Sequence, residues 1–346
     1  MFDLKEAVNG IKCYNGEPMT IMEVCGTHTA EIIKNGIPSL LSDKIKLVAG
    51  PGCPVCVTVG EYADRLVELS MQKGITVASF GDMLRVPGSK GSLKDASARG
   101  GSVLMLYSPL ELLDIAEKNK DEIFVFAAVG FETTTPVYAV LIDEAIRRNI
   151  NNIRLLTALK TMPAVIDYLC SQGGVDAFIA PGHVAVITGA NAFLPAAEKY
   201  NLPFAVSGFS GAELVCSIYA LTRLKGRGVV KNYYKNAVNA EENKKAKALV
   251  DKYFEPCSAA WRGIGVLENS AVALKKKYQR FDMGSRQIVE DFKLNPACAC
   301  GEIILGRRTP QDCALFGKVC TPETPQGSCM VSCEGTCYSC YTTERM

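Results

Sequence analysis

Fifteen cysteines occur in this chain of 346 residues, and eight of them lie within residues 298–346. This C-terminal segment has no histidine and little periodic apolar sequence, so its side chains alone are not expected to form a hydrophobic core. The eight residues are Cys298, Cys300, Cys313, Cys320, Cys329, Cys333, Cys337 and Cys340. Thiols at this density indicate a metal, a metal cluster or disulfides, and the choice among these largely decides the function.

Composition excludes several classes of protein. A net charge of +2 argues against a nucleic-acid binder, which usually carries a strong basic excess. No apolar run reaches about 18 residues, so we expect no membrane span. The first ten residues, MFDLKEAVNG, lack the apolar run of a secretory signal, and we expect a cytoplasmic protein. Cytosolic thiols stay mostly reduced, which favours metal or redox chemistry over a structural disulfide framework.

Short apolar runs alternate with amphipathic stretches over the first two thirds of the chain, a pattern typical of parallel α/β sheets. We predict one helix over Val59–Lys73, stopped by Gly74. The predicted strands are Thr20–Val24, Ile45–Ala49, Ile75–Ser79, Ser102–Leu106, Ile123–Val129, Ile153–Thr157, Ala177–Ala180 and Phe204–Ser207.

The predicted fold class is α/β, with two similar parallel-sheet α/β lobes and a smaller Cys-rich iron–sulfur region. We assign residues 20–118 to the first lobe, residues 119–225 to the second, and residues 1–19 and 226–346 to a helical and Cys-rich region. Lys225–Lys252 is rich in lysine and is expected to be helical with a solvated face. Pro256–Cys257 and Trp261–Gly265 are expected to form a loop or a short strand.

Four predicted strands are followed by a tight Gly- or Pro-containing loop and then a helix. In open parallel sheets the ligand site lies beyond the carboxyl ends of the strands, where such loops occur. The four loops therefore predict a composite cleft between the two lobes. Their sequences are AGPGCPVC, VGFETTTP, APGHVAV and VSGFSGAEL.

The Cys53-x-x-Cys56 motif follows an apolar strand and precedes a helix. Such spacing brings two sulfurs within disulfide reach, and helix-terminal amides stabilise the thiolate form. The motif is therefore typical of a dithiol for thiol–disulfide exchange. The alternative is half of a zinc site, but no second Cys-x-x-Cys lies nearby in the sequence.

Both histidines of the chain lie in predicted strand-end loops. Cys25 and His28 could ligate one metal, or His28 could lower the pKa of Cys25. His183 occurs in the loop Ala180-Pro181-Gly182-His183, and scarcity favours a functional reading of both histidines over a structural one. Glu132, in Gly-Phe-Glu-Thr-Thr-Thr-Pro, could belong to an anion- or proton-handling loop or to a simple helix cap.

A [4Fe–4S] cluster needs four thiolates. After Cys298-x-Cys300 the C-terminal cysteines are separated by twelve, six, eight, three, three and two residues. A zinc ribbon needs two Cys-x-x-Cys knuckles, and only Cys337–Cys340 has that spacing. Irregular long gaps favour a cluster held by loops, and thiols beyond four leave room for a disulfide beside it. Four other cysteines are interpreted as buried or incidental thiols: Cys13, Cys170, Cys216 and Cys257.

A set of motifs in this sequence resembles the HypD family of hydrogenase maturation factors. The motifs are CGTHT, GPGCPVC, GFETTTP, PGHV, CACGEIILG and CALFGKVCTPETPQGSCM, and the resemblance covers nearly the whole chain. It implies two α/β lobes with a third, cluster-bearing region. It also implies a role in building the Fe(CN)2CO group of [NiFe]-hydrogenases, with a HypC-like chaperone and a HypE-like cyanide donor as partners.

The resemblance assigns roles to the residues of the predicted cleft. Cys25 would be the thiolate that holds the iron, and Cys53 and Cys56 would be the redox dithiol. His28, Glu132 and His183 would line the same cleft.

In the C-terminal region, the resemblance implies Cys313, Cys320 and Cys337 as cluster ligands with Cys298 as the fourth, and Cys300 can replace Cys298. By analogy with ferredoxin:thioredoxin reductase, Cys300 and Cys329 would be a redox disulfide pair beside the cluster. The sequence departs from the family pattern at Cys333, where serine is expected, and at the additional Cys340.

These expectations combine into one mechanism. Cyanide that arrives as an enzyme thiocyanate is released only with two electrons, which a dithiol supplies on closing to a disulfide. The chain is thus expected to act more as a redox-active assembly scaffold than as a turnover enzyme. Two alternatives remain: an iron–sulfur thiol–disulfide reductase, and an interaction protein stapled by zinc.

Overall fold

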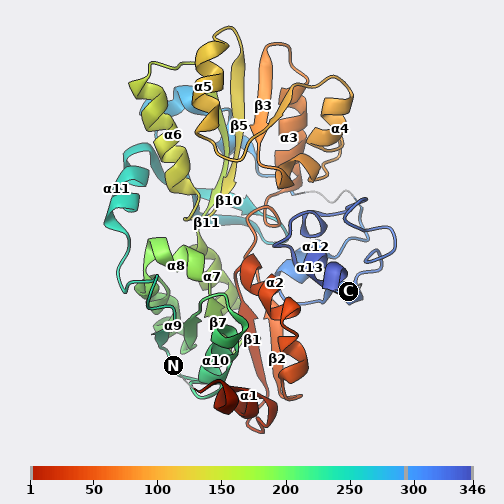
Figure 1. Ribbon diagram of the computed structural model, residues 1–346, viewed down its shortest axis with the longest axis vertical. Coiled ribbons are helices and arrows are strands. Elements are labelled where there is room, and N and C mark those ends of the chain that lie inside the picture. Colours follow the sequence, from red (N-terminus) through yellow and green to blue (C-terminus); the bar gives the residue numbers. More distant parts are fainter. Residues whose placement is uncertain (1–2, 292–294, 344–346) are drawn as a thin grey trace.

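The computed structural model describes residues 3–291 and 295–343, so residues 1–2, 292–294 and 344–346 of the predicted helical and Cys-rich region lie outside it. Two sheets lie one above the other along the long axis, and the C-terminal region packs against one side (Figure 1). This arrangement confirms the predicted α/β class with a Cys-rich region near the C-terminus.

The first sheet has the strand order β2-β1-β7-β8-β9, and all its pairings are parallel. Its strands are β1 (Met19–Glu23), β2 (Ile45–Ala49), β7 (Ala177–Ala180), β8 (Phe204–Val206) and β9 (Val230–Asn232).

The second sheet has the order β10-β11-β6-β5-β3-β4, in which β10, β11 and β6 pair antiparallel and the remaining pairings are parallel. Its strands are β3 (Ile75–Ser79), β4 (Val103–Met105), β5 (Ile123–Gly130), β6 (Ile153–Lys160), β10 (Phe254–Trp261) and β11 (Gly265–Leu274). All eight strands predicted from the sequence are present in the two sheets.

The strands are not distributed between the sheets as the predicted lobes imply. Residues 20–118 contribute β1 and β2 to the first sheet but β3 and β4 to the second. The chain crosses to the second sheet after β2, returns after β6 and crosses again after β9. Consecutive strands commonly lie in one sheet. Here β1 instead pairs with β7, with Ile21 opposite Ala177.

The helices cover the faces of the sheets and carry the predicted amphipathic pattern. In α3 the side chains of Tyr62, Ala63, Leu66 and Val67 are buried, as the spacing predicts. The helices are α1 (Leu4–Lys12), α2 (Gly26–Lys34), α3 (Gly60–Ser70), α4 (Leu93–Ala98), α5 (Glu111–Lys118), α6 (Thr135–Arg147), α7 (Met162–Gln172), α8 (Gly182–Thr188), α9 (Leu194–Tyr200), α10 (Gly211–Thr222), α11 (Lys244–Tyr253), α12 (Cys300–Ile304) and α13 (Thr336–Thr343). No helix within the described ranges combines the length and the apolar character needed to span a lipid bilayer.

One local prediction after residue 225 was wrong and another was confirmed. Only the end of Lys225–Lys252 is helical, as α11, because part of the preceding segment forms β9 on the edge of the first sheet and the rest forms turns, bends and irregular backbone. Pro256–Cys257 lies in strand β10, and Trp261–Gly265 joins β10 to β11 through a turn, in agreement with the expected loop or short strand. The hairpin of β10 and β11 extends the second sheet, and Phe254 and Trp261 are buried within it.

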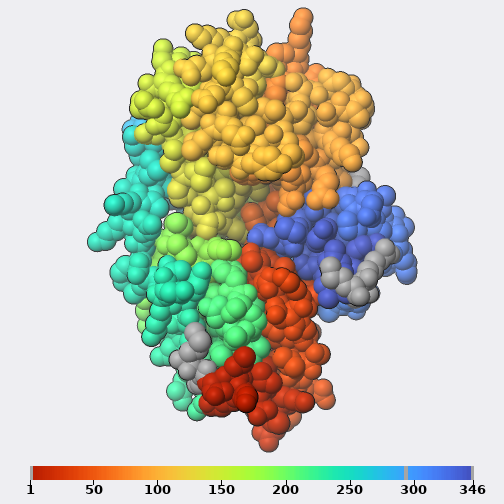
Figure 2. Space-filling view, in the orientation of Figure 1, coloured from red at the N-terminus to blue at the C-terminus, as the bar shows by residue number. Residues whose placement is uncertain are grey.

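The C-terminal region does not fold as an isolated unit. Its residues Ile303, Ile304 and Met330 share one hydrophobic core with Val24 and Phe178 of the first sheet and its adjoining loop. Figure 2 shows this region, in blue, fitted against the side of the molecule next to the N-terminal segment. The shared core therefore agrees with the expectation that the side chains of this region alone would not form a hydrophobic core.

One contact between glycines joins the β10–β11 hairpin to α12. A Cβ on Gly263 would lie 2.6 Å from the Cα of Gly301, so a side chain does not fit between them. Gly263 also has φ of +76°, which favours glycine.

We predict that Gly263→Ala destabilises the protein by about 1–3 kcal/mol more than Gly265→Ala. Gly265 is the matched control because it lies in the same turn with φ of +99°, but has no atom within 4 Å of a Cβ. Both variants share the cost of positive φ, so the difference reports the contact with Gly301. Urea unfolding measures it, and equal midpoints would refute the contact.

Candidate functional site

The thiol of Cys25 lies at the point where β1 leads into α2. Cys25 is the residue before the first turn of α2, and its backbone N–H donates a 2.9 Å hydrogen bond to Oε2 of Glu23. Its residue surface is only 6% exposed. Burial raises the pKa of Cys25 to about 12, although the backbone N–H groups of His28 and Thr27 oppose the rise. The free thiol is therefore protonated at neutral pH.

The Cys53 loop packs directly on the Cys25 loop. The backbone N–H of Gly26 donates to the carbonyl of Gly52 at 3.1 Å. A Cβ on Gly52 would overlap the backbone of Cys25, so this approach requires glycine. The structure thus brings the CGTHT and GPGCPVC loops into backbone contact, although the chain places them a full strand and helix apart.

Cys53 and Cys56 face each other within a turn. The backbone N–H of Cys56 donates to Sγ of Cys53 at 3.2 Å, and both thiols are free. The expected position at a helix N-terminus was wrong, because α3 begins only at Gly60. Residues 53–56 instead form turns, so a local amide rather than the first turn of a helix is the donor to Cys53.

Cys56 also contacts the C-terminal region. Its Sγ lies 4.0 Å from the carbonyl oxygen of Ser328, whose hydroxyl donates to the carbonyl of Cys56 at 3.1 Å. Burial raises the pKa of Cys56 well above its ordinary value, and contacts with the thiols of Cys329 and Cys53 raise it further. Cys56 therefore has one sulfur neighbour in its own loop and another from the C-terminal region.

The sulfur contacts continue from Cys329 to Cys300. The Sγ atoms of these two cysteines are 3.0 Å apart, and both residues are buried. Cys329 further contacts the thiol of Cys337, and Cys300 contacts that of Cys298. A continuous series of buried sulfurs thus runs from the dithiol loop through the predicted redox pair to two predicted cluster ligands.

The four predicted cluster ligands are buried around these thiols. They are Cys298, Cys313, Cys320 and Cys337.

The chemistry of this cysteine group fits an iron–sulfur cluster. Burial raises the pKa of Cys320, and the negative charges that Cys298 and Cys313 would carry raise it further. A bound cationic cluster core relieves this repulsion. The backbone N–H of Gln326 donates to Sγ of Cys320 at 3.3 Å, a bond typical of cluster environments. A Cβ on Gly327 would lie 3.0 Å from Sγ of Cys298, so glycine leaves the sulfur free.

The described residues do not form a site for a single metal ion. Across residues 3–291 and 295–343, no three His, Cys, Asp or Glu side chains converge to hold a single ion. Of the two cysteines that depart from the family pattern, Cys333 is exposed, whereas Cys340 lines a cavity of about 340 Å³ that Glu23 and Arg307 also line.

The buried guanidinium of Arg262 connects the two cysteine regions. Its backbone N–H and Nε donate to the carbonyls of Val57 and Thr58, each at 2.9 Å, directly after the dithiol loop. Contact with Cys300 and burial raise the pKa of Cys298, and the positive charge of Arg262 opposes that rise. Arg262 is thus placed to stabilise negative charge on the cysteines, a role that the sequence reading missed.

His28 and His183 approach each other across the ring of Phe209. The ring centroids of His28 and His183 lie 4.8 Å and 4.0 Å from that of Phe209. Nε2 of His28 is 3.0 Å from the carbonyl of Gly208, and Nδ1 is buried without a partner among the described residues. Burial lowers the pKa of His28 to about 4, so its neutral ring adds no positive charge beside Cys25 at neutral pH.

The carboxyl of Glu132 lines a cavity that is separate from the predicted cysteine and histidine site. Its Oε1 accepts from the backbone N–H of Met162 at 2.8 Å, and its Oε2 is buried without a partner among the described residues. Burial raises the pKa of Glu132 to about 7. The carboxyl lines a cavity of about 190 Å³ whose walls include Thr135 and Lys247 but none of the predicted site cysteines or histidines.

Two further carboxylates adjoin Cys25 and were not singled out from the sequence. Glu23 is buried, and burial raises its pKa to about 8. An acidic residue within the apolar strand TIMEV, two residues before Cys25, was the available signal. Glu334 accepts a 2.9 Å hydrogen bond from the hydroxyl of Thr27, and its position beside that loop could not be read from sequence.

Comparisons with known proteins show the family of this chain. The family model described as "HypD: Hydrogenase formation hypA family" matches residues 3–344. The chain is 40% identical over 338 residues to the hydrogenase maturation factor HypD of Azotobacter vinelandii, covering 94% of this chain and 89% of that protein. It is 41% identical to HypD of Rhizobium leguminosarum bv. viciae over 330 residues (91% and 86%) and 36% identical to HypD of Escherichia coli K12 over 349 residues (98% and 92%).

Replacing Glu23 by Gln tests the environment next to Cys25. The pKa of Glu23 is raised in the folded state, so between pH 4.5 and 8 the unfolded chain loses this proton and the folded protein keeps it. Stability contributed by Glu23 is therefore lost as the pH rises. We expect the free energy of unfolding of Glu23→Gln, relative to the unmodified protein, to increase by up to about 1.4 kcal/mol per pH unit across this window.

Chemical denaturation at a series of pH values measures this difference, with Glu31→Gln as a control at a partly exposed glutamate in the neighbouring helix α2. A difference that does not change between pH 5 and 8 would show that Glu23 ionises normally.

Proposed function

Because the chain belongs to the HypD family of hydrogenase maturation factors, we propose that it is a redox scaffold for assembling the Fe(CN)2CO group of [NiFe]-hydrogenases. The observation that supports this best is the continuous contact of buried sulfurs from Cys53 and Cys56 to Cys329 and Cys300. The backbone of the Cys25 loop contacts that of the loop that carries Cys53. This contact supports a scaffold in which the thiol proposed to hold the iron lies close to the proposed two-electron donor.

Cys25 is proposed to hold the iron that is the cargo of the scaffold. A soft thiolate suits low-spin iron, and binding must release the proton that burial retains on the free thiol. The backbone N–H groups of Thr27 and His28 stabilise the resulting thiolate. Glu23 is largely protonated at pH 7, so only one negative charge forms here. A cysteine of a HypC-like chaperone is proposed as the second ligand of the iron.

Glu334 of the C-terminal region packs over the Cys25 loop and limits how such a partner can approach Cys25. Glu334 binds Thr27 and packs on Gly26, and His183 is exposed close to this contact. Because Cys25 is buried in the free protein, docking of the chaperone must open the contact between the C-terminal region and the Cys25 loop.

Cys53 and Cys56 are proposed to release cyanide from a thiocyanate delivered by a HypE-like donor. The two thiols and R–S–C≡N react to give a Cys53–Cys56 disulfide, R–SH and HCN. The S–C bond of the thiocyanate breaks, the dithiol is oxidised by two electrons, and its two protons leave with the thiol and the cyanide. A neutral dithiol supplies both protons, and burial keeps Cys56 in that form.

Cys329 and Cys300 are proposed to restore the dithiol. Exchange at Cys56 transfers the disulfide to Cys300 and Cys329 and leaves Cys53 and Cys56 as thiols. When bound by Cys298, Cys313, Cys320 and Cys337, a [4Fe–4S] cluster would supply electrons one at a time. If Cys300 replaces Cys298 as a ligand, Cys298 takes the place of Cys300 in the redox pair with Cys329. The charge of Arg262 favours the thiolate forms on this side of the path.

We predict that Cys25→Ala abolishes iron binding at the scaffold site without loss of the cluster. Protein purified anaerobically with a HypC-like chaperone should show cyanide and carbonyl infrared bands, and the variant should lack them. The brown absorbance of the cluster should be unchanged in the variant, which controls for folding. Bands that persist in Cys25→Ala would refute the assignment of Cys25, and colourless protein containing zinc would favour the interaction-protein alternative.

We further predict that cyanide release depends on both members of the dithiol. Reduced protein given a HypE-like donor in its thiocyanate form should release one cyanide per dithiol, measured by trapping. Cys56→Ser should lower the yield at least about tenfold, because Cys53 then loses the thiol with which it closes a disulfide. Cys53→Ser leaves Cys56 in contact with Cys329, so it should lower the yield less. Cys13→Ser, at an exposed cysteine, is the matched control. Full release from Cys56→Ser would refute the mechanism.

A further inference from the structure

A lysine at the end of β6 is buried without a partner for its charge. Lys160 is only 3% exposed, and its ammonium has neither a hydrogen bond nor an ion pair with any residue in 3–291 or 295–343. The ring of Trp261 lies close to this ammonium, with its centroid 5.5 Å from Nζ. Lysine is almost never so buried unless it is paired, so this ammonium requires an explanation.

The neighbouring charges do not neutralise it. Arg262 is a second buried cation nearby, and its own nearest carboxylate is Asp291, 3.9 Å away. Cys257 lies on the other side, and burial raises the pKa of its thiol, so it stays neutral. Two buried cations therefore share one carboxylate, which leaves an excess positive charge at this point of the interior.

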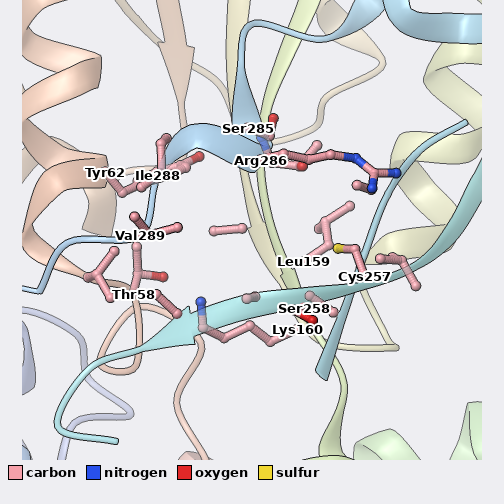
Figure 3. A pocket seen from close by; sticks show the side chains of 18 of the residues that line it. Thr58, Tyr62, Leu159, Lys160, Cys257, Ser258, Ser285, Arg286, Ile288 and Val289 are labelled. Atoms are coloured by element: carbon pink, nitrogen blue, oxygen red, sulfur yellow. The ribbon is translucent and has the colours of Figure 1, made fainter. Parts of the chain in front are cut away.

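Lys160 lines a cavity of about 200 Å³ between β6, the β10–β11 hairpin and residues 285–289 (Figure 3). Figure 3 shows its side chain along the floor of this space, with Thr58 on one side and Cys257 on the other. The cavity reaches the surface at Val266 and Val289, which are 58% and 50% exposed. Its volume far exceeds the roughly 10–15 Å³ that a single water needs.

The shape of the hairpin contributes to this space. The pairing of β10 with β11 shifts register between Cys257 and Ala259, and such irregularities commonly re-aim side chains beside functional sites. The residues that span the shift, Cys257, Ser258 and Ala259, all line the cavity.

The residues that line the cavity indicate one chemical class of ligand. Most wall residues are alanine, valine, leucine or isoleucine, and the hydroxyl-bearing residues of the wall are Thr58, Tyr62, Thr157, Ser258 and Ser285. Arg286 also borders the cavity, but its guanidinium is already paired with Glu255. One unpaired ammonium in apolar walls suits a ligand with a single negative charge and a short apolar body, whereas a polyanion would lack counter-charges.

We propose that this cavity is a binding site for a small monocarboxylate, with the ammonium of Lys160 as the counter-charge of the ligand. The site is separate from the thiols of the proposed function and does not depend on that function. A hydroxyl such as that of Ser258 is available for a hydrogen bond to the second carboxylate oxygen.

Titration calorimetry with butyrate on the full-length protein, purified anaerobically with its metal content intact, tests the proposal. Butyrate should bind saturably, and its uncharged analogue butyramide should bind at least about tenfold more weakly, equal to about 1.4 kcal/mol. Lys160→Met should lose butyrate binding by a similar factor, whereas Lys160→Arg should retain it in part. Lys199→Met is the matched control, because Lys199 is an exposed, paired lysine elsewhere on the surface.

Absence of saturable butyrate binding by the unmodified protein overturns the proposal, as does equal binding of butyramide. Equal binding of butyrate by Lys160→Met overturns it as well. The comparison of the two ligands on the unmodified protein decides the question even if Lys160→Met does not fold.

Discussion

The contact between residues 53–56 and residues 328–329 is the interaction on which the rest of the site depends. Ser328 and Cys56 meet through a hydroxyl–carbonyl hydrogen bond, and the thiols of Cys56 and Cys329 lie side by side. These residues are separated by 272 positions in the chain, and their contact joins the α/β body to the Cys-rich region. The proposed exchange between the Cys53/Cys56 dithiol and the Cys300/Cys329 pair passes through this contact.

Burial sets the chemistry of the whole site. It keeps the thiols of Cys25 and Cys56 protonated, His28 neutral and Glu23 largely protonated at neutral pH. Burying an isolated charge costs free energy, so the uncharged forms of these four side chains are favoured in the free protein. Binding of a metal cation reverses this preference, because a cation stabilises the thiolate. The proposed iron and cluster would therefore stabilise the charged forms of these thiols.

Local sequence patterns predicted the eight strands and the loops that carry Cys25, Cys53 and His183, because apolar runs and glycine-rich turns are local signals. They did not predict that β1 pairs with β7, or that the hairpin of β10 and β11 completes the second sheet. Pairing across such distances depends on packing between faces, which periodicity does not report. Glu23 and Arg262 escaped notice for the same reason, since what distinguishes them is burial beside thiols.

The central claim is that Cys56 and Cys329 are immediate neighbours on a path of buried sulfurs. The double variant Cys53→Ser/Cys300→Ser tests it most directly. This variant removes Cys53, the proposed disulfide partner of Cys56, and Cys300, the proposed disulfide partner of Cys329. Mild oxidation followed by peptide mass spectrometry identifies the disulfide that forms. The account predicts a Cys56–Cys329 disulfide within one molecule. A Cys56 thiol that stays reduced or pairs elsewhere, in a variant that unfolds like the unmodified protein, would contradict it.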